Sequence, residues 1–301
     1  MSAAAGPPPH AASLRQRIAN VARKRGTTEL RITVAVCNTV IGQILPPGVV
    51  KGGTAMKLRL GEANSRFTPD VDSARRAGMS LDDYIDELEQ NLHEGWHGFT
   101  ARLVRKEPAT PAGVPDDYVM KPFEIKLEYM GKPVKTMVFE LGRDEVGSTE
   151  TSVITIAEDI LDLFAELGLP RPGRVALLAT EHQIAQKLHA CTTPDGNGGN
   201  DRAHDLVDLQ LLVEDDPPDL AKLNNVGARL FAARRVGTWP PVVRTWPGWE
   251  SLYEAAADGL DVLPGVDGAV AWANDLLARV GAERNPQGRT PFRAPSASRS
   301  P

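Results

Sequence analysis

The residues with the clearest chemical potential lie in two short segments, Lys51-Gly-Gly-Thr-Ala and Arg66-Phe-Thr-Pro-Asp-Val-Asp. A Gly-Gly pair at a helix start lets the backbone approach a phosphate closely, and the unpaired N–H groups and the helix dipole favour the anion. Asp70 and Asp72 are two residues apart on a predicted strand, so they point to the same side and can hold one or two Mg²⁺ ions. The spacing predicts a phosphoryl- or nucleotidyl-transfer site. A turn followed by a solvated edge strand is the alternative interpretation.

A third carboxylate often completes such a metal site from a neighbouring strand. Glu124, Lys126 and Glu128 alternate with apolar residues along the segment 123–129, so they share its polar face. We choose Glu128 as the third metal ligand. An ordinary solvent-facing strand explains the same alternation equally well.

A second group of charged residues follows later in the chain. Lys187 lies beside the apolar stripe of a predicted helix, from which its ammonium could bind a triphosphate. Asp205 could orient Lys187 or assist deprotonation of an acceptor hydroxyl. Asp208 lies three residues further on, on the same helix face. Surface charge on two helices is the alternative.

These segments resemble the motifs of the AbiEii/AbiGii-type nucleotidyltransferase toxins, a MenT-like family within the DNA polymerase β-like nucleotidyltransferase superfamily. The family pattern is roughly K-G-G-T-A, then R-F-S-x-D-[LIV]-D, then E-K-L-x-A, then R-x-x-D-x-x-D-L. The matching segments begin, in the same order, at Lys51, Arg66, Gln186 and Arg202. Two residues depart from the pattern: Thr68 replaces Ser, and Gln186 replaces Glu.

The resemblance implies an α+β fold, with a minimal nucleotidyltransferase core built on a mixed β-sheet and followed by a mainly helical C-terminal domain. It implies Mg²⁺, or Mn²⁺ in its place, on Asp70 and Asp72, with an NTP as substrate. The late catalytic aspartate would be Asp205, with Asp208 as the second candidate. The residues expected to hold the nucleotide are Gly52, Gly53, Thr54, Arg66 and Lys187.

The implied activity is transfer of a nucleoside monophosphate from NTP to RNA, with the tRNA 3′ end as the first candidate acceptor. Such a toxin inhibits translation and growth, acts in the cytoplasm and has a cognate antitoxin protein as partner. Two other interpretations stay open. One is an NTP-binding toxin module that transfers nothing. The other is a zinc hydrolase through His93-Glu94-x-x-His97, although Gly95 weakens the continuous helix that this motif needs.

The elements that must position these residues can be predicted from apolar periodicity. It favours helices over residues 13–24, 27–45 and 80–92, and strands over 99–105, 123–129 and 135–141. After residue 147 the pattern favours helices alone, beginning with 153–167. We therefore expect a disordered tail at 1–12, the nucleotidyltransferase core at 13–147, a helical domain carrying Lys187 and Asp205 at 148–283, and a disordered basic tail at 284–301.

The composition is that of an ordinary globular chain. Among 301 residues, 34 Lys and Arg against 39 Asp and Glu leave a net charge of −5, and 42% are apolar, which excludes collagen, a coiled-coil rod and a wholly disordered chain. Two cysteines make no disulfide framework and fit a reducing compartment. No apolar run approaches the roughly 20 residues of a membrane helix, so no membrane partner is expected.

Overall fold

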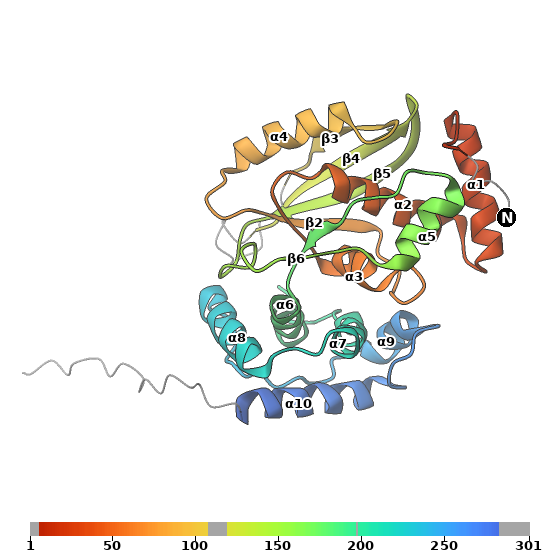
Figure 1. The fold of residues 1–301 in the computed structure, drawn as a ribbon. Coiled ribbons are helices and arrows are strands. Elements are labelled where there is room, and N and C mark those ends of the chain that lie inside the picture. Colours follow the sequence, from red (N-terminus) through yellow and green to blue (C-terminus); the bar gives the residue numbers. More distant parts are fainter. Residues whose placement is uncertain (1–5, 108–118, 197, 283–301) are drawn as a thin grey trace, which may run out of the picture.

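The computed structural model describes residues 6–107, 119–196 and 198–282 (Figure 1). Its strands are β1 (Gly48–Lys51), β2 (Asp70–Arg75), β3 (Phe99–Arg105), β4 (Lys121–Tyr129), β5 (Lys132–Gly142), β6 (Val153–Thr155) and β7 (Val175–Leu177). Its helices are α1 (Ala11–Lys24), α2 (Glu29–Ile44), α3 (Gly52–Leu60), α4 (Leu81–Glu94), α5 (Glu158–Leu167), α6 (Thr180–Thr192), α7 (His204–Asp215), α8 (Leu220–Arg234), α9 (Trp249–Ala257) and α10 (Val266–Ala282).

In the described part of the chain, the strands form one mixed sheet in the order β3-β4-β5-β2-β1-β7-β6. Strands β3, β4 and β5 are an antiparallel meander, as their alternating sequences predict. Strand β2 runs parallel to β5 and antiparallel to β1. The centre of the sheet is therefore β2, the strand that carries Asp70 and Asp72, and its neighbours on both sides can place side chains next to them.

The first hydrophobic core lies between one face of this sheet and helices α1, α2, α4 and α5. Helix α4 illustrates the local cause. Ser80 caps its N-terminus by accepting a hydrogen bond from the backbone N–H of Asp83. Its buried residues recur at helical spacing and pack with Phe99 of β3; they are Tyr84, Ile85, Leu88 and Leu92. Burying each such side chain contributes about 1.5–3 kcal/mol.

Helices α6 to α10 lie below the sheet in Figure 1 and enclose a second core. Met56 belongs to this second core, although it lies on α3, in the first half of the chain. The two halves therefore meet along α3, the helix that begins with Gly52 and Gly53. The expected mixed sheet followed by a mainly helical part is confirmed.

Two boundaries differ from the expected ones. The predicted helix over 153–167 is strand β6 followed by α5, because Val153-Ile-Thr is a β-branched run and the acidic Glu158 and Asp159 suit the first turn of a helix. Strands β6 and β7 extend the sheet on the side of β1, so the sheet continues past residue 147.

The N-terminal segment also differs from the expected tail at 1–12. Helix α1 begins at Ala11, and the hydroxyl of Tyr129 donates a hydrogen bond of 2.6 Å to the carbonyl of Pro8. Residues 6–12 therefore pack on the sheet. Residues 1–5 and the expected basic tail at 284–301 lie outside the described residues. None of the helices described has the length and apolar character needed to cross a membrane.

Candidate active site

The glycine pair forms the junction between β1 and α3. Strand β1 ends at Lys51, and α3 begins at the next residue, Gly52, whose φ of 62° lies in the left-handed region. A Cβ atom on Gly52 would overlap Oδ2 of Asp72, and one on Gly53 would overlap Oγ1 of Thr68. Only glycine fits at either position, and the N-terminal end of α3 lies directly against a carboxylate of β2.

Asp70 and Asp72 share the face of β2 opposite to Val71, which is buried in the first core. On the neighbouring strand β5, Glu140 is the direct partner of Asp72. Side chains in such cross-strand positions lie about 5 Å apart at Cβ. Three carboxylates therefore gather on this side of the sheet.

Glu128, the residue predicted as the third ligand, lies elsewhere. It pairs with Pro133 near the β4–β5 hairpin, seven residues along β5 from Glu140. At roughly 3.3 Å per residue, this places Glu128 about 23 Å along the strand direction from the level of Asp72. The prediction of Glu128 is therefore wrong on distance, and Glu140 occupies the position that it was meant to fill.

The surroundings of the Asp72 carboxylate disfavour its negative charge, and a bound cation would offset this. Burial raises its pKa to about 6; Lys51 lowers the pKa, whereas Asp70 and Glu140 raise it further. Two buried oxygens close to the glycine pair, Oγ1 of Thr68 and Oε1 of Gln183, have no hydrogen-bond partner among the described residues. These unpaired oxygens and carboxylates are the donor type that Mg²⁺ prefers.

No group of three or more His, Cys, Asp or Glu side chains within the described ranges has the arrangement of a complete metal site. A metal ion held by Asp70 and Asp72 would therefore take further oxygens from phosphates, as Mg²⁺ commonly does. The residues fit that use. The amino end of α3 lies beside them and favours phosphate oxygens.

Two residues predicted to hold the nucleotide are committed to the protein itself. The hydroxyl of Thr54 donates a hydrogen bond of 2.6 Å to the carbonyl of Asp70 and so fastens α3 to β2. Nε of Arg66 lies 3.0 Å from both carboxylate oxygens of Asp208. In this structure Thr54 therefore holds α3 against β2, and Arg66 holds the α3–β2 loop against α7.

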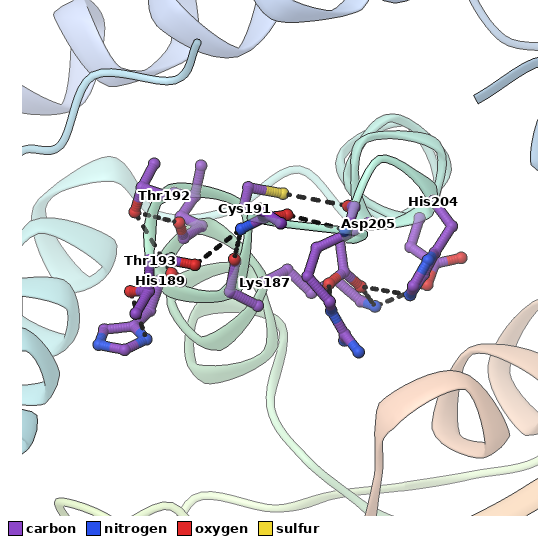
Figure 2. A network of polar contacts seen from close by, with 12 residues as sticks. Lys187, His189, Cys191, Thr192, Thr193, His204 and Asp205 are labelled. Atoms are coloured by element: carbon purple, nitrogen blue, oxygen red, sulfur yellow. Dashed lines mark hydrogen bonds and ion pairs between the residues drawn. The ribbon is translucent and has the colours of Figure 1, made fainter. Parts of the chain in front are cut away.

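Lys187 of α6 is buried between two aspartates of α7 (Figure 2). Its Nζ lies 2.8 Å from Oδ1 of Asp205 and 2.6 Å from Oδ2 of Asp208. The other oxygen of Asp205 accepts from Nε of Arg202 at 2.8 Å. With Arg66 on Asp208, the cluster forms a continuous chain in which three cations enclose two carboxylates.

The charges of this cluster are fixed by their neighbours. Burial alone would lower the pKa of Lys187, but Asp205 and Asp208 outweigh burial and hold that pKa above its usual value. Burial alone would raise the pKa of Asp205, but Lys187 and Arg202 outweigh it and hold that pKa well below the usual range. A carboxylate so firmly ionised is a poor proton acceptor. The geometry therefore favours the orienting role predicted for Asp205 over the deprotonating one.

The cluster is connected to the carboxylates of β2. Arg202 lowers the pKa of Asp72, so its charge lies within electrostatic reach of that carboxylate. Gln183, one helical turn before Lys187, donates a hydrogen bond of 3.0 Å to the carbonyl of Gly52. Of the two late aspartates, Asp205 pairs with Arg202, and Asp208 pairs with Arg66.

Sequence reasoning missed Lys51 and Glu140 as site residues. Lys51 is the direct strand partner of Asp72, and of the cations that lower the pKa of Asp72 it has the largest effect. Among the described residues, Lys51 has no ion pair within 4 Å, and its ammonium makes one side-chain hydrogen bond, of 3.3 Å to Sδ of Met120. A signal existed for both residues: Lys51 precedes the glycine pair, and Glu140 alternates with the apolar Phe139 and Leu141.

The zinc-site alternative does not gain support from the local structure. Helix α4 ends at Glu94, Gly95 follows with a φ of 75°, and His97 lies beyond the helix with a φ of 45°. The motif needs both histidines on one face of a continuous helix. His93 and His97 do not share one.

A solved structure of MenT4, a nucleotidyltransferase toxin from Mycobacterium tuberculosis H37Rv, has a similar fold, with a TM-score of 0.52 and 16% identity over 88% of this chain and 98% of that one. No curated protein sequence matches the chain.

The model of the nucleotidyl transferase AbiEii toxin family, described as a type IV toxin–antitoxin system, matches residues 44–276. That range includes the glycine pair, the aspartates of β2 and the Lys187 cluster. It is also well over half of the chain. The chain therefore belongs to the AbiEii family of nucleotidyltransferase toxins of type IV toxin–antitoxin systems.

Proposed function

We propose that the chain transfers a nucleoside monophosphate from an NTP to the 3′ hydroxyl of an RNA, with tRNA as the first acceptor, and so inhibits translation and growth. The observation that carries the proposal is the contact between the glycine pair and Asp72. It brings a phosphate-binding helix end and paired carboxylates to one point.

The proposed reaction forms a bond between the acceptor oxygen and the α-phosphorus and breaks the bond from that phosphorus to the pyrophosphate. Asp70 and Asp72 would hold Mg²⁺, with Glu140 beside them. The metal would supply activation of the hydroxyl and neutralisation of the phosphates. Gly52 and Gly53 leave room for the phosphates, and Lys51 adds a positive charge next to them.

We infer that the Lys187 cluster places a rigid group with net positive charge beside this site. Three cations and two carboxylates leave one net positive charge, and the side chain of Arg202 is 45% exposed. Buried, paired groups keep their geometry without reorganising as phosphate charge develops. We therefore infer that Lys187 and Asp205 hold Arg202 and α6 in place next to the nucleotide.

The choice of RNA as acceptor rests on the family resemblance, as does the antitoxin partner. An NTP-binding module that transfers nothing is the second candidate, because the same helix end and carboxylates would bind an NTP without an acceptor. The structure does not favour the zinc hydrolase, since His93 lies on α4 and His97 lies in the turn that follows it.

The test is incubation of the purified chain with each α-labelled NTP, Mg²⁺ and total tRNA. Asp70→Asn is the inactive variant, and Glu128→Gln is its matched control at a distant carboxylate. Label in RNA with wild type and Glu128→Gln, and none with Asp70→Asn, would support the proposal. Label on protein would mean that the acceptor is a protein and not RNA. Binding of NTP with no transfer of label would favour the NTP-binding module.

A further inference from the structure

A pocket of about 590 Å³ lies between the two halves of the molecule, apart from the aspartates of β2. One wall comes from the α1–α2 connection and the α3–β2 loop, and the other from α9, which lies below α3 in Figure 1. Its lining contains neither the glycine pair nor Asp70 or Asp72. The volume is within the range of pockets that bind small molecules, about 300–1,000 Å³.

Three arginines line this pocket: Arg25, Arg31 and Arg66. Each is held by a carboxylate, so its position is fixed: Arg25 by Asp159, Arg31 by Glu62 and Arg66 by Asp208. Each also keeps one terminal nitrogen without a hydrogen-bond partner among the described residues, namely Nη2 of Arg25, Nη1 of Arg31 and Nη2 of Arg66. Such preorganised guanidinium groups suit phosphate.

The carboxylates that line the pocket leave these nitrogens available. Glu62 is buried, and its two oxygens are taken by Lys57 and by Arg31. Asp258 is exposed at the other wall. Of the carboxylates in the described lining, Glu62 is paired with two cations and Asp258 has no ion pair.

The opposite wall carries apolar side chains beside Asp258. Leu252 and Ala255 of α9 line the pocket, together with Leu260 and, from the first half, the ring of Phe67. Leu252 is 41% exposed, so its side chain is accessible at this wall. A flat apolar group against α9 and an anionic group at the arginines would match the two walls.

We propose that this pocket is a second ligand site, which binds a nucleoside monophosphate with its base against α9 and its phosphate at the three arginines. The inference does not depend on nucleotidyl transfer to RNA. Arg66 joins the pocket to Asp208 and Lys187, so a phosphate that engages Arg66 would act on the cluster beside Asp72. A ligand in this pocket would therefore change the rate of catalysis without occupying the site at the glycine pair and Asp72.

The experiment measures binding of AMP, CMP, GMP and UMP to the full chain by calorimetry in EDTA, so that no metal supports binding at Asp70 and Asp72. Inorganic phosphate and the matching nucleoside are measured alone. Ala255→Glu places a carboxylate at the apolar wall, and Ala255→Gln is its uncharged counterpart. Ala232→Glu makes the same change on the exposed surface of α8, away from the pocket.

At least one monophosphate should bind with a 1:1 ratio and at least tenfold more tightly than phosphate or its nucleoside. Ala255→Glu should weaken it at least tenfold, whereas Ala255→Gln and Ala232→Glu should stay within twofold of wild type. Absence of binding, or equal binding by Ala255→Glu, would overturn the proposal.

Photolabelling of the wild type gives a measurement that does not depend on the variant folding. With 8-azido-AMP or 5-azido-UMP, label should appear in the peptide that contains α9, and unlabelled monophosphate should compete it away. Label confined to peptides without α9 would overturn the proposal. Transfer to RNA is assayed separately, so a failure there leaves this result unaffected.

Discussion

Gly52 and Asp72 lie so close together that a methyl group on Gly52 would overlap Oδ2 of Asp72. Gly52 also has a φ of 62°, which side chains rarely adopt. Gly78 has a similar φ of 80°, but a Cβ atom there would meet nothing within 4 Å. Substitutions at the two glycines therefore distinguish the cost of backbone strain, present at both, from the cost of displacing the carboxylate, present only at Gly52.

Gly52→Ala should reduce nucleotidyl transfer at least 100-fold, because the added methyl group displaces Asp72 and blocks phosphate from the end of α3. Gly78→Ala should keep at least half of the wild-type activity, while losing about 1–2 kcal/mol of stability through backbone strain alone. Initial rates and urea unfolding of both variants provide the check. Equal activity of the two variants would show that the contact with Asp72 does not matter.

Glu140→Gln should lower the transfer rate at least tenfold, since Glu140 is the strand partner of Asp72 and the third carboxylate on that face. Glu128→Gln should change the rate less than twofold, because its strand position is about 23 Å away along the sheet. The dependence of the rate on Mg²⁺ concentration should shift only for Glu140→Gln. The reverse ranking would restore Glu128 as the metal-site residue.

The choice of Glu128 shows where sequence reasoning stops. The alternation in 123–129 and 135–141 correctly predicted β4 and β5, because a half-buried strand repeats its apolar residues every second position. It did not predict that β5, and not β4, lies next to β2. That order is set by which strands pair across the sheet, a nonlocal contact that the alternation around Glu128 and around Glu140 does not specify.

The Lys187 cluster had a stronger signal. The helical spacing of Lys187, Asp205 and Asp208 placed them correctly on α6 and α7. The expectation that Lys187 reaches a triphosphate came from its residue type, but a buried ammonium must be paired, and the nearest carboxylates are those of α7. Partners from another helix decide such a role, and periodicity within one helix does not specify them.

Lys187→Met should destabilise the protein by about 3–5 kcal/mol, because it leaves Asp205 and Asp208 buried without their shared cation. Lys24→Met removes a lysine that is 70% exposed and pairs with Glu166 at the surface, so it should cost less than about 1 kcal/mol. Unfolding in urea, followed by circular dichroism, measures both. A loss below 1 kcal/mol for Lys187→Met would mean that the cluster does not hold α6 and α7 together.

Asp72→Asn should make the metal-free protein more stable at pH 8 while abolishing transfer. Burial raises the pKa of Asp72 to about 6 from an ordinary 3.8, so the folded protein prefers the protonated acid, and that preference stabilises it fully only below pH 3.8. The contribution is lost as the pH rises through 6, where the ionised carboxylate has no ion pair within 4 Å among the described residues. The difference between these pKa values corresponds to at most about 3 kcal/mol.

The measurement is urea unfolding in EDTA at pH 8 and at pH 4. Asparagine at residue 72 cannot ionise, so the variant should exceed wild type at pH 8, and the gap should close towards pH 4. Asp258→Asn, at an exposed carboxylate, should differ from wild type by less than about 0.5 kcal/mol at both values. A destabilised Asp72→Asn at pH 8 would show that its carboxylate is held by partners within the protein and is not waiting for a cation.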